Sequence, residues 1–245
     1  MELSIIIPTY DEARKIGRDI KAASAFLAAR MGGGEIIVAD DGSRDNTPDI
    51  ASATPTAPDV TLHILRSAEH KGKGFALRSG IAASHGRYVM FADSGLTTPY
   101  ENALRGIELI RNGQCELAHG SRKLPESIIH RPQQRDRKIS SALFRITMRF
   151  LLPVPRELTD TQCGFKVYRG DVARMLSREC VADGFLFDVE MLLRAGRHGL
   201  TVREFPIEWS CDRDSRLTFR RSTWPILREI FAVRSALASY SPGNP

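Results

Sequence analysis

Short apolar or alternating segments take turns with helix-patterned segments from the N-terminus onward, and this alternation restricts the fold more than any other feature. The strand-like segments are 3–8, 35–40, 60–66 and 87–93. Between them, 12–30 and 75–85 carry apolar residues at helical spacing, and another helix is predicted to start at Thr47-Pro48. Strands and helices repeated at this spacing predict parallel βαβ units, and therefore an α/β fold with a doubly wound sheet.

The rest of the chain continues the pattern less regularly. We expect helices at 101–113, 139–152, 184–199 and 223–240, and strands at 116–122 and 201–210. Segment 123–138 is polar and basic without periodicity, so it is predicted to be a mobile loop. Because no linker interrupts the chain, we expect one domain. Its catalytic part would span 1–222, with an amphipathic helix and short tail, 223–245, packed on it.

Polar clusters follow the predicted strands and point to a ligand site. PTYDE, DDGS and ADSG each follow a strand, and HKGKG precedes a helix. In doubly wound sheets ligands bind beyond the carboxyl ends of the strands, where such clusters meet. Taken alone, DDGS fits either a helix cap or a contact to a nucleobase or ribose. KGKG fits either a phosphate cradle or solvated surface, and the P-loop pattern and GxGxxG are both absent.

The charge balance narrows the classes of ligand. The net charge is +6 and the pI about 9.3, which favours anionic ligands such as phosphates. Nucleic acid is disfavoured because the basic stretches lack interleaved aromatic residues. The four cysteines are widely spread, without a CxxC pair, so neither a zinc site nor a disulfide framework is expected. We expect a cytoplasmic protein, since no signal peptide or membrane span is evident.

Seven segments, in order, give the chain a family resemblance. They are IIIPTYDE, IIVADDGSRDNT, HKGKGFALRSGI, YVMFADSGLTTP, AHGSR, DTQCGFKVYR and FLFDVEMLLRA. Together they resemble the inverting glycosyltransferases of family 2, in the branch of the dolichyl-phosphate mannose and β-glucosyl synthases, over about residues 3–215. The resemblance implies a GT-A fold, a nucleotide-diphosphate sugar donor, a divalent cation (Mg²⁺ or Mn²⁺) and usually a polyprenyl-phosphate acceptor.

The resemblance also implies site residues. Those matching nucleotide contacts are Pro8, Tyr10, Glu12, Asp40, Asp41, Lys73, Gly74 and Asp93, and Arg122 matches an arginine near the diphosphate. On the sugar and acceptor side the matches are Asp160, Gln162, Gly164, Lys166, Asp188 and Glu190, with Arg213 and Arg216 as phosphate contacts. Asp93 matches the first carboxylate of the family's metal-binding Asp-Ala-Asp motif.

The chain departs from the family at that motif. Aligning LTTP with the family's Leu-Ser-Thr-Pro puts Asp93-Ser94-Gly95 on Asp-Ala-Asp, so Gly95 replaces the second carboxylate. Asp93 and the donor's diphosphate could still hold a cation weakly, since Mg²⁺ sites often use one or two carboxylates plus substrate phosphates. Two alternatives are an arginine such as Arg122 in place of the metal, and an inactive nucleotide-sugar-binding homologue.

Two kinds of chemistry remain open. The first is sugar transfer with inversion to a phosphate or hydroxyl acceptor; a hydroxyl would need a general base, for which Asp160, Asp188 and Glu190 are candidates. The second is a pyranose–furanose mutase without an external acceptor, which the altered metal motif and the lack of a membrane anchor also fit. The basic helix 139–152 and the terminal helix 223–240 fit either packing on the sheet or peripheral contact with the inner face of the membrane. A homo-oligomer is also open.

Overall fold

The computed structural model describes residues 1–132, 151–155, 157–212 and 223–238. A seven-stranded sheet forms its centre, in the order β3 (Val60–Arg66), β2 (Gly34–Asp40), β1 (Leu3–Thr9), β4 (Tyr88–Ala92), β7 (Phe165–Arg169), β5 (Leu117–Ser121) and β8 (Val202–Pro206). Strand β7 runs antiparallel to β4 and β5, and the other neighbours are parallel. The predicted α/β class with a mainly parallel sheet is confirmed.

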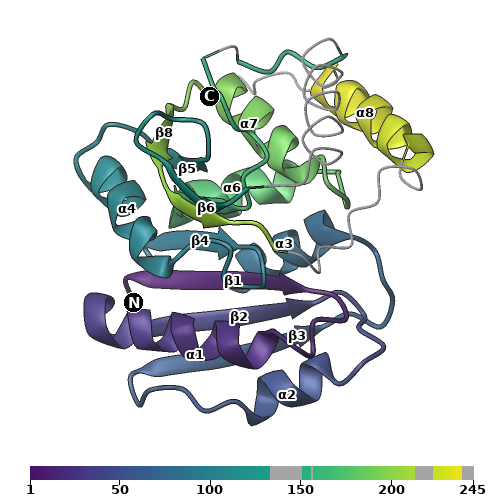
Figure 1. The fold of residues 1–245 in the computed structure, drawn as a ribbon. Helices are drawn as coiled ribbons and strands as arrows, with labels where there is room; N and C mark the ends of the chain where they lie inside the picture. Colours follow the sequence, from purple (N-terminus) through teal and green to yellow (C-terminus); the bar gives the residue numbers. More distant parts are fainter. Residues whose placement is uncertain (133–150, 156, 213–222, 239–245) are drawn as a thin grey trace.

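Helices cover both faces of the sheet, as Figure 1 shows. On one face lie α1 (Ile16–Phe26), α2 (Thr47–Ala53) and α4 (Ala103–Arg111); on the other lie α3 (Lys73–Ala82), α6 (Gly170–Glu179), α7 (Phe187–Arg197) and α8 (Thr223–Ala238). Successive residues of a strand point to opposite faces, so Ile5 and Ile7 enter one core while Ile6 enters the other. This two-sided burial explains why the strands of the sheet centre read as continuous apolar runs.

Three elements differ from the prediction. Segment 123–138, predicted as a loop, contains β6 (Ile128–Arg131), which pairs in parallel with β9 (Glu208–Ser210). The single strand predicted over 201–210 is divided into β8 and β9 at the buried Ile207. Helix α6 was not predicted. The four residues of β6 are all exposed, so no burial pattern marks the strand, and its partner lies far along the chain. The helix predicted over 139–152 falls almost wholly outside the described residues.

Helix α8 packs on the core beside α7 (Figure 1). Ile230, Val233 and Leu237 are buried in the cluster that also contains residues of α3, α6 and α7. At its C-terminal end, the Arg197 guanidinium of α7 donates a hydrogen bond to the Leu237 carbonyl. Phe231, on the opposite side of the helix, is 70% exposed. Among the described helices, none combines the length and the apolar character that a membrane crossing requires.

Truncating two neighbouring residues of α8 should change the free energy of unfolding by very different amounts. Ile230→Ala should lower the free energy of unfolding by about 2–5 kcal/mol, because Ile230 is 2% exposed and its loss leaves a cavity. Phe231→Ala removes more atoms but should change stability by less than about 0.5 kcal/mol, as expected for a surface site. Urea denaturation of both variants makes the measurement, and equal losses would contradict this docking of α8.

Candidate active site

Most of the predicted site residues that the structure describes lie at one edge of the sheet, where β1, β2, β4 and β5 end and β7 begins. Asp93 follows β4 directly, and its backbone N–H donates to the Gly164 carbonyl at the start of β7 (3.0 Å). A Cβ atom at Gly164 would lie 2.0 Å from Asp93 Oδ2. A side chain at position 164 would therefore push the Asp93 carboxylate away, which explains the glycine at this point of DTQCGFK. The Asp93 side chain remains 44% exposed.

Lys73 connects two of the predicted carboxylates. Its ammonium group lies 2.7 Å from Asp93 Oδ1 and 3.7 Å from Asp188 Oδ2. Asp188 also accepts a hydrogen bond from Lys166 (2.8 Å), whose side chain is fully buried and also donates to the Cys163 carbonyl (2.5 Å). Burial opposes the charge on Asp188, but the two lysines outweigh burial and hold the pKa of Asp188 below its ordinary value. Asp188 is therefore a permanently ionised bridge between α7, β7 and the start of α3.

Arg122 and Asp160 form a second, bidentate ion pair. Arg122 Nε and Nη2 donate to the two oxygens of Asp160 at 2.6 and 2.7 Å. Glu204 of β8 fixes this pair by accepting the backbone N–H groups of Thr159 (2.9 Å) and Asp160 (2.7 Å). Burial opposes the charge on Asp160, yet the Arg122 hydrogen bonds outweigh it, so the pKa of Asp160 is lowered. The Arg122 guanidinium also stacks over the Trp209 ring, at 5.3 Å from its centroid.

The two adjacent aspartates at the end of β2, Asp40 and Asp41, bind groups of the protein itself. Asp41 accepts the backbone N–H groups of Lys71 (2.9 Å) and Gly72 (2.7 Å) and pairs with His70 (2.7 Å). Asp40 accepts hydrogen bonds from the Ser43 backbone (3.2 Å) and hydroxyl. Both aspartates are 2% exposed. Their carboxylates hold together the loops at the end of β2 and before α3.

Aromatic rings provide a more exposed surface at the same edge. The rings of Tyr10 and His70 have centroids 3.9 Å apart and an interplanar angle of 30°, and the His70 side chain is 51% exposed. Pro8 lies in β1 and is half-buried. Glu12, just beyond β1, pairs with Lys15 (3.0 Å).

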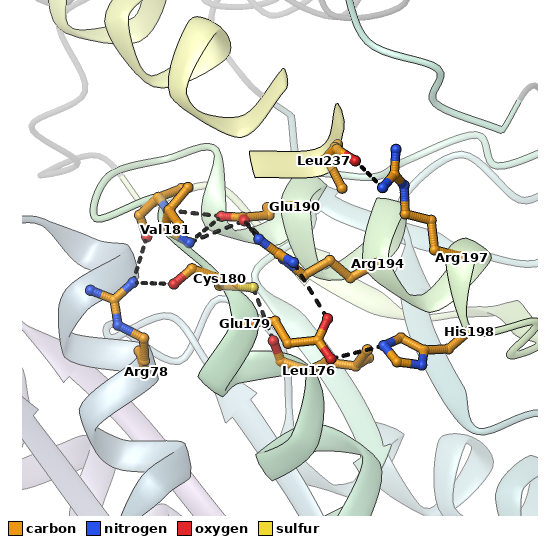
Figure 2. Close-up of polar contacts among 11 residues, drawn as sticks. Arg78, Leu176, Glu179, Cys180, Val181, Glu190, Arg194, Arg197, His198 and Leu237 are labelled. Atoms are coloured by element: carbon orange, nitrogen blue, oxygen red, sulfur yellow. Dashed lines mark hydrogen bonds and ion pairs between the residues drawn. The ribbon is translucent and has the colours of Figure 1, made fainter. Parts of the chain in front are cut away.

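Glu190 contacts Arg194 and the backbone of the segment before α7, as Figure 2 shows. It is fully buried and accepts the backbone N–H groups of Val181 (3.0 Å) and Ala182 (2.8 Å). Arg194 pairs with it at 2.6 Å and reaches Glu179 at 3.4 Å. Two residues apart on a helix, Asp188 and Glu190 point in different directions. The structure thus uses Glu190 to hold the segment before α7.

That segment, 181–186, packs against the start of α3, which carries Lys73. The Asp183 carbonyl accepts the Phe75 N–H (3.0 Å), and a Cβ atom at Gly74 would lie 2.7 Å from the Ala182 carbonyl oxygen. From the other side, Glu229 of α8 accepts the Gly184 N–H. Gly74, predicted to contact nucleotide, is therefore required as a glycine by this backbone contact.

Gly95 stands where the family resemblance expects the second metal-binding carboxylate, and it lies between Asp19 and Asp212. Gly95 has a φ of +98°, a conformation that favours glycine, and its N–H donates to Asp19 Oδ2 (2.7 Å). A Cβ atom at Gly95 would lie 3.2 Å from Asp212 Oδ2. Asp212 pairs with Lys15 at 2.6 Å. Within the part of the chain that the structure describes, no three His, Cys, Asp or Glu side chains form a ready-made metal group.

The sequence did not predict several residues that contact the candidate site. They are Lys15, Asp19, His70, Glu204, Trp209, Asp212 and Glu229. His70 alone had a local signal, because it opens the HKGKG loop; the others become neighbours only through the fold. Gln162 lies half-buried in the turn before Cys163. Arg213 and Arg216 lie outside the described residues.

Comparison with solved structures identifies the fold. Glucosyl-3-phosphoglycerate synthase from Mycobacterium tuberculosis, solved with Mn²⁺, UDP and glucosyl-3-phosphoglycerate, matches with a TM-score of 0.70 at 18% identity, over 99% of this chain and 82% of that one. Its structure with Mg²⁺ and UDP matches equally well, at 0.70 and 19% identity over 99% and 81%. The protein therefore has the GT-A fold of nucleotide-sugar glycosyltransferases.

Sequence comparison assigns the family. The model of the family "Glycosyl transferase family 2" matches residues 4–176, so the chain belongs to glycosyltransferase family 2 and is a glycosyltransferase. Glycosyltransferase AglD of Haloferax volcanii is 32% identical over 90% of this chain, although the chain spans only 35% of AglD. The dolichyl-phosphate β-glucosyltransferases of Drosophila melanogaster and Saccharomyces cerevisiae are 30% and 28% identical over 95% and 96% of this chain and 74% of their own lengths.

The structural role of Glu190 predicts a loss of stability when it is removed. Glu190→Ala should lower the free energy of unfolding by about 3–5 kcal/mol, because it leaves the buried Arg194 without its closest partner. Asp171→Ala is the control: it breaks an exposed pair with Arg169 and should cost less than about 1 kcal/mol. Urea denaturation compares them, and a stable Glu190→Ala variant that has lost only activity would argue for a catalytic role instead.

Proposed function

We propose that this glycosyltransferase transfers glucose from UDP-glucose to the phosphate of a polyprenyl phosphate, with inversion at the anomeric carbon. A phosphate oxygen of the acceptor forms the new bond to that carbon, the bond to the donor diphosphate breaks, and UDP leaves with the electron pair. Relatives named as dolichyl-phosphate β-glucosyltransferases and structural neighbours solved with UDP and UDP-glucose support this choice of donor and acceptor.

One observation carries the choice of a phosphate over a hydroxyl acceptor. The three carboxylates nominated as general bases are all paired with cations: Asp160 with Arg122, Asp188 with Lys166 and Lys73, and Glu190 with Arg194. A hydroxyl acceptor needs a base to take its proton, and a base with a lowered pKa does this poorly. A phosphate acceptor is already an anion and needs cations rather than a base.

Lys73 and Arg122 are the cations that we assign to the phosphates. Their side chains are 19% and 22% exposed, whereas Lys166 is fully buried and serves Asp188. Burial opposes their charge, but the neighbouring carboxylates outweigh it and raise the pKa of both side chains, so both stay cationic at neutral pH. Fixed positive groups at the diphosphate stabilise the charge that develops as UDP departs.

We assign the nucleotide base to the surface formed by Tyr10 and His70. Aromatic rings offer a flat face to a base, and the loop that carries His70 is fixed by Asp41. Asp40 and Asp41 would then act on the nucleotide mainly by shaping this loop.

A divalent cation, Mg²⁺ or Mn²⁺, belongs to this proposal. The structural neighbours were solved with these ions. Asp93 fits the role of ligand: its carboxylate is a hard oxygen donor, is 44% exposed, and lies against a glycine that leaves it room. When bound, such an ion would neutralise charge on the diphosphate leaving group.

Donor and acceptor can be tested in one assay. With radiolabelled UDP-glucose, Mn²⁺ and polyprenyl phosphate in detergent, we expect a solvent-extractable glucolipid. GDP-mannose as donor and unphosphorylated polyprenol as acceptor are the controls, and neither should yield product. Equal product from polyprenol would overturn the phosphate acceptor. A furanosyl signal by NMR without any acceptor would revive the mutase alternative, which the names of the relatives cited above do not support.

The pH dependence should follow the acceptor rather than Asp160 or Asp188. The pKa values of Asp160 and Asp188 are lowered, so both carboxylates stay ionised from pH 8 to pH 5 and cannot produce an acid limb in this range. A phosphate monoester loses its second proton at about pH 6, so below this pH it carries one negative charge fewer. We therefore expect kcat/KM for the acceptor to fall below about pH 6.

An acceptor analogue shows whether the acceptor or a group on the enzyme causes this fall in kcat/KM. A difluoromethylphosphonate is more acidic than a phosphate monoester, so the limb should move to lower pH with such an analogue. A limb that stays at the same pH with both acceptors would belong to a group on the enzyme and would contradict the assignment.

A further inference from the structure

The space that a side chain at position 95 would enter is filled by a carboxylate from a distant segment. Asp212, just after β9, places Oδ2 at 3.2 Å and Cγ at 3.5 Å from the Cβ position of Gly95. The resemblance to family 2 puts a metal-binding carboxylate at position 95. Gly95 and Asp212 therefore complement each other: the residue at 95 lacks a carboxylate, and Asp212 brings one to the same place.

We propose that Asp212 is the second protein ligand of the divalent cation, acting with Asp93 and the donor diphosphate. This inference rests on the proposed function, because the diphosphate completes the coordination. Two carboxylates with substrate phosphates are a usual ligand set for Mg²⁺.

Charged side chains of both signs gather around Gly95. Lys15 bridges Glu12 (3.0 Å) and Asp212 (2.6 Å), with its side chain 9% exposed. Asp19, which is 1% exposed, gives Oδ2 to the Gly95 N–H, while its Oδ1 is buried without a hydrogen-bond partner. Arg18 reaches the Gly95 carbonyl at 3.5 Å. Lys15 and Arg18 thus lie among the carboxylates that surround Gly95.

Burial supports the same reading of this region. It raises the pKa of Asp19 to about 6, against the lowering effect of the Gly95 hydrogen bond. A buried carboxylate with an unused oxygen is costly unless a positive charge lies near it. Arg18 and Lys15 already contribute positive charge at Asp19, and a divalent cation bound by Asp93 and Asp212 would add to it.

The simpler role for Asp212 is to anchor Lys15, and the two roles give opposite results for one variant. If Asp212 binds the metal, the Lys15 ammonium competes with the metal for the same oxygen. Lys15→Met should then leave Mn²⁺ affinity unchanged or increase it. If Asp212 only positions Lys15, removing either partner should have the same effect on Mn²⁺ affinity.

Mn²⁺ binding, followed by electron paramagnetic resonance of the free ion, tests the proposal without an activity assay. The full chain is titrated with Mn²⁺ alone and with Mn²⁺ plus UDP. Asp212→Asn should weaken Mn²⁺ binding in the presence of UDP about tenfold or more. Glu208→Gln is the matched control: it removes an exposed carboxylate from β9, in the same segment, and should bind Mn²⁺ like the wild type.

The outcomes separate this proposal from the proposed function. Unchanged Mn²⁺ affinity in Asp212→Asn, or equal weakening in Lys15→Met, overturns Asp212 as a ligand while glucosyl transfer stands on its own assay. A wild type that binds no Mn²⁺ with UDP also overturns it. Circular dichroism confirms that each variant is folded, and Asp212→Glu, which keeps the carboxylate, should retain more Mn²⁺ affinity than Asp212→Asn.

Discussion

The ion pairs that Lys73 makes with Asp93 and Asp188 are the interactions on which the rest of the site depends. Charges at the edge of a buried sheet are costly unless they are paired and hydrogen-bonded. Lys73 meets this requirement for two carboxylates at once, and Lys166 adds a second, fully buried partner for Asp188. Through these contacts, β4, β7, α3 and α7 are held in one arrangement, and the Asp93 carboxylate is kept beside Gly164.

The pairing of the site's carboxylates with lysine and arginine also affects which acceptor the site suits. A site in which the inner carboxylates are already neutralised by lysine or arginine is poorly suited to taking a proton from a hydroxyl. It is well suited to holding anions, because Lys73 and Arg122 remain partly exposed among those pairs. Glycosyl transfer to a phosphate requires this balance: cations for the leaving diphosphate and for the acceptor, and no strong base.

The structural supports of the site come from the second half of the chain. Glu204 of β8 fixes Asp160, and Glu190 of α7 and Glu229 of α8 hold segment 181–186 against the loop of Lys73. The terminal helix thus reaches the site through one carboxylate. In these contacts an acidic side chain satisfies backbone N–H groups that would otherwise be buried without partners.

The sequence by itself determined the α/β class, the strands of the sheet centre and the edge at which the candidate site residues were expected. Apolar strands buried on both faces leave a signal in any short window, and so do the polar clusters that follow them. Only the tertiary structure placed the Glu190 carboxylate against the backbone N–H groups of Val181 and Ala182. It also decided that β6 and β9 pair, and that Asp212 fills the space beside Gly95. The physical reason is that each of these depends on where a side chain points or on a partner far along the chain, and neither is encoded in local spacing.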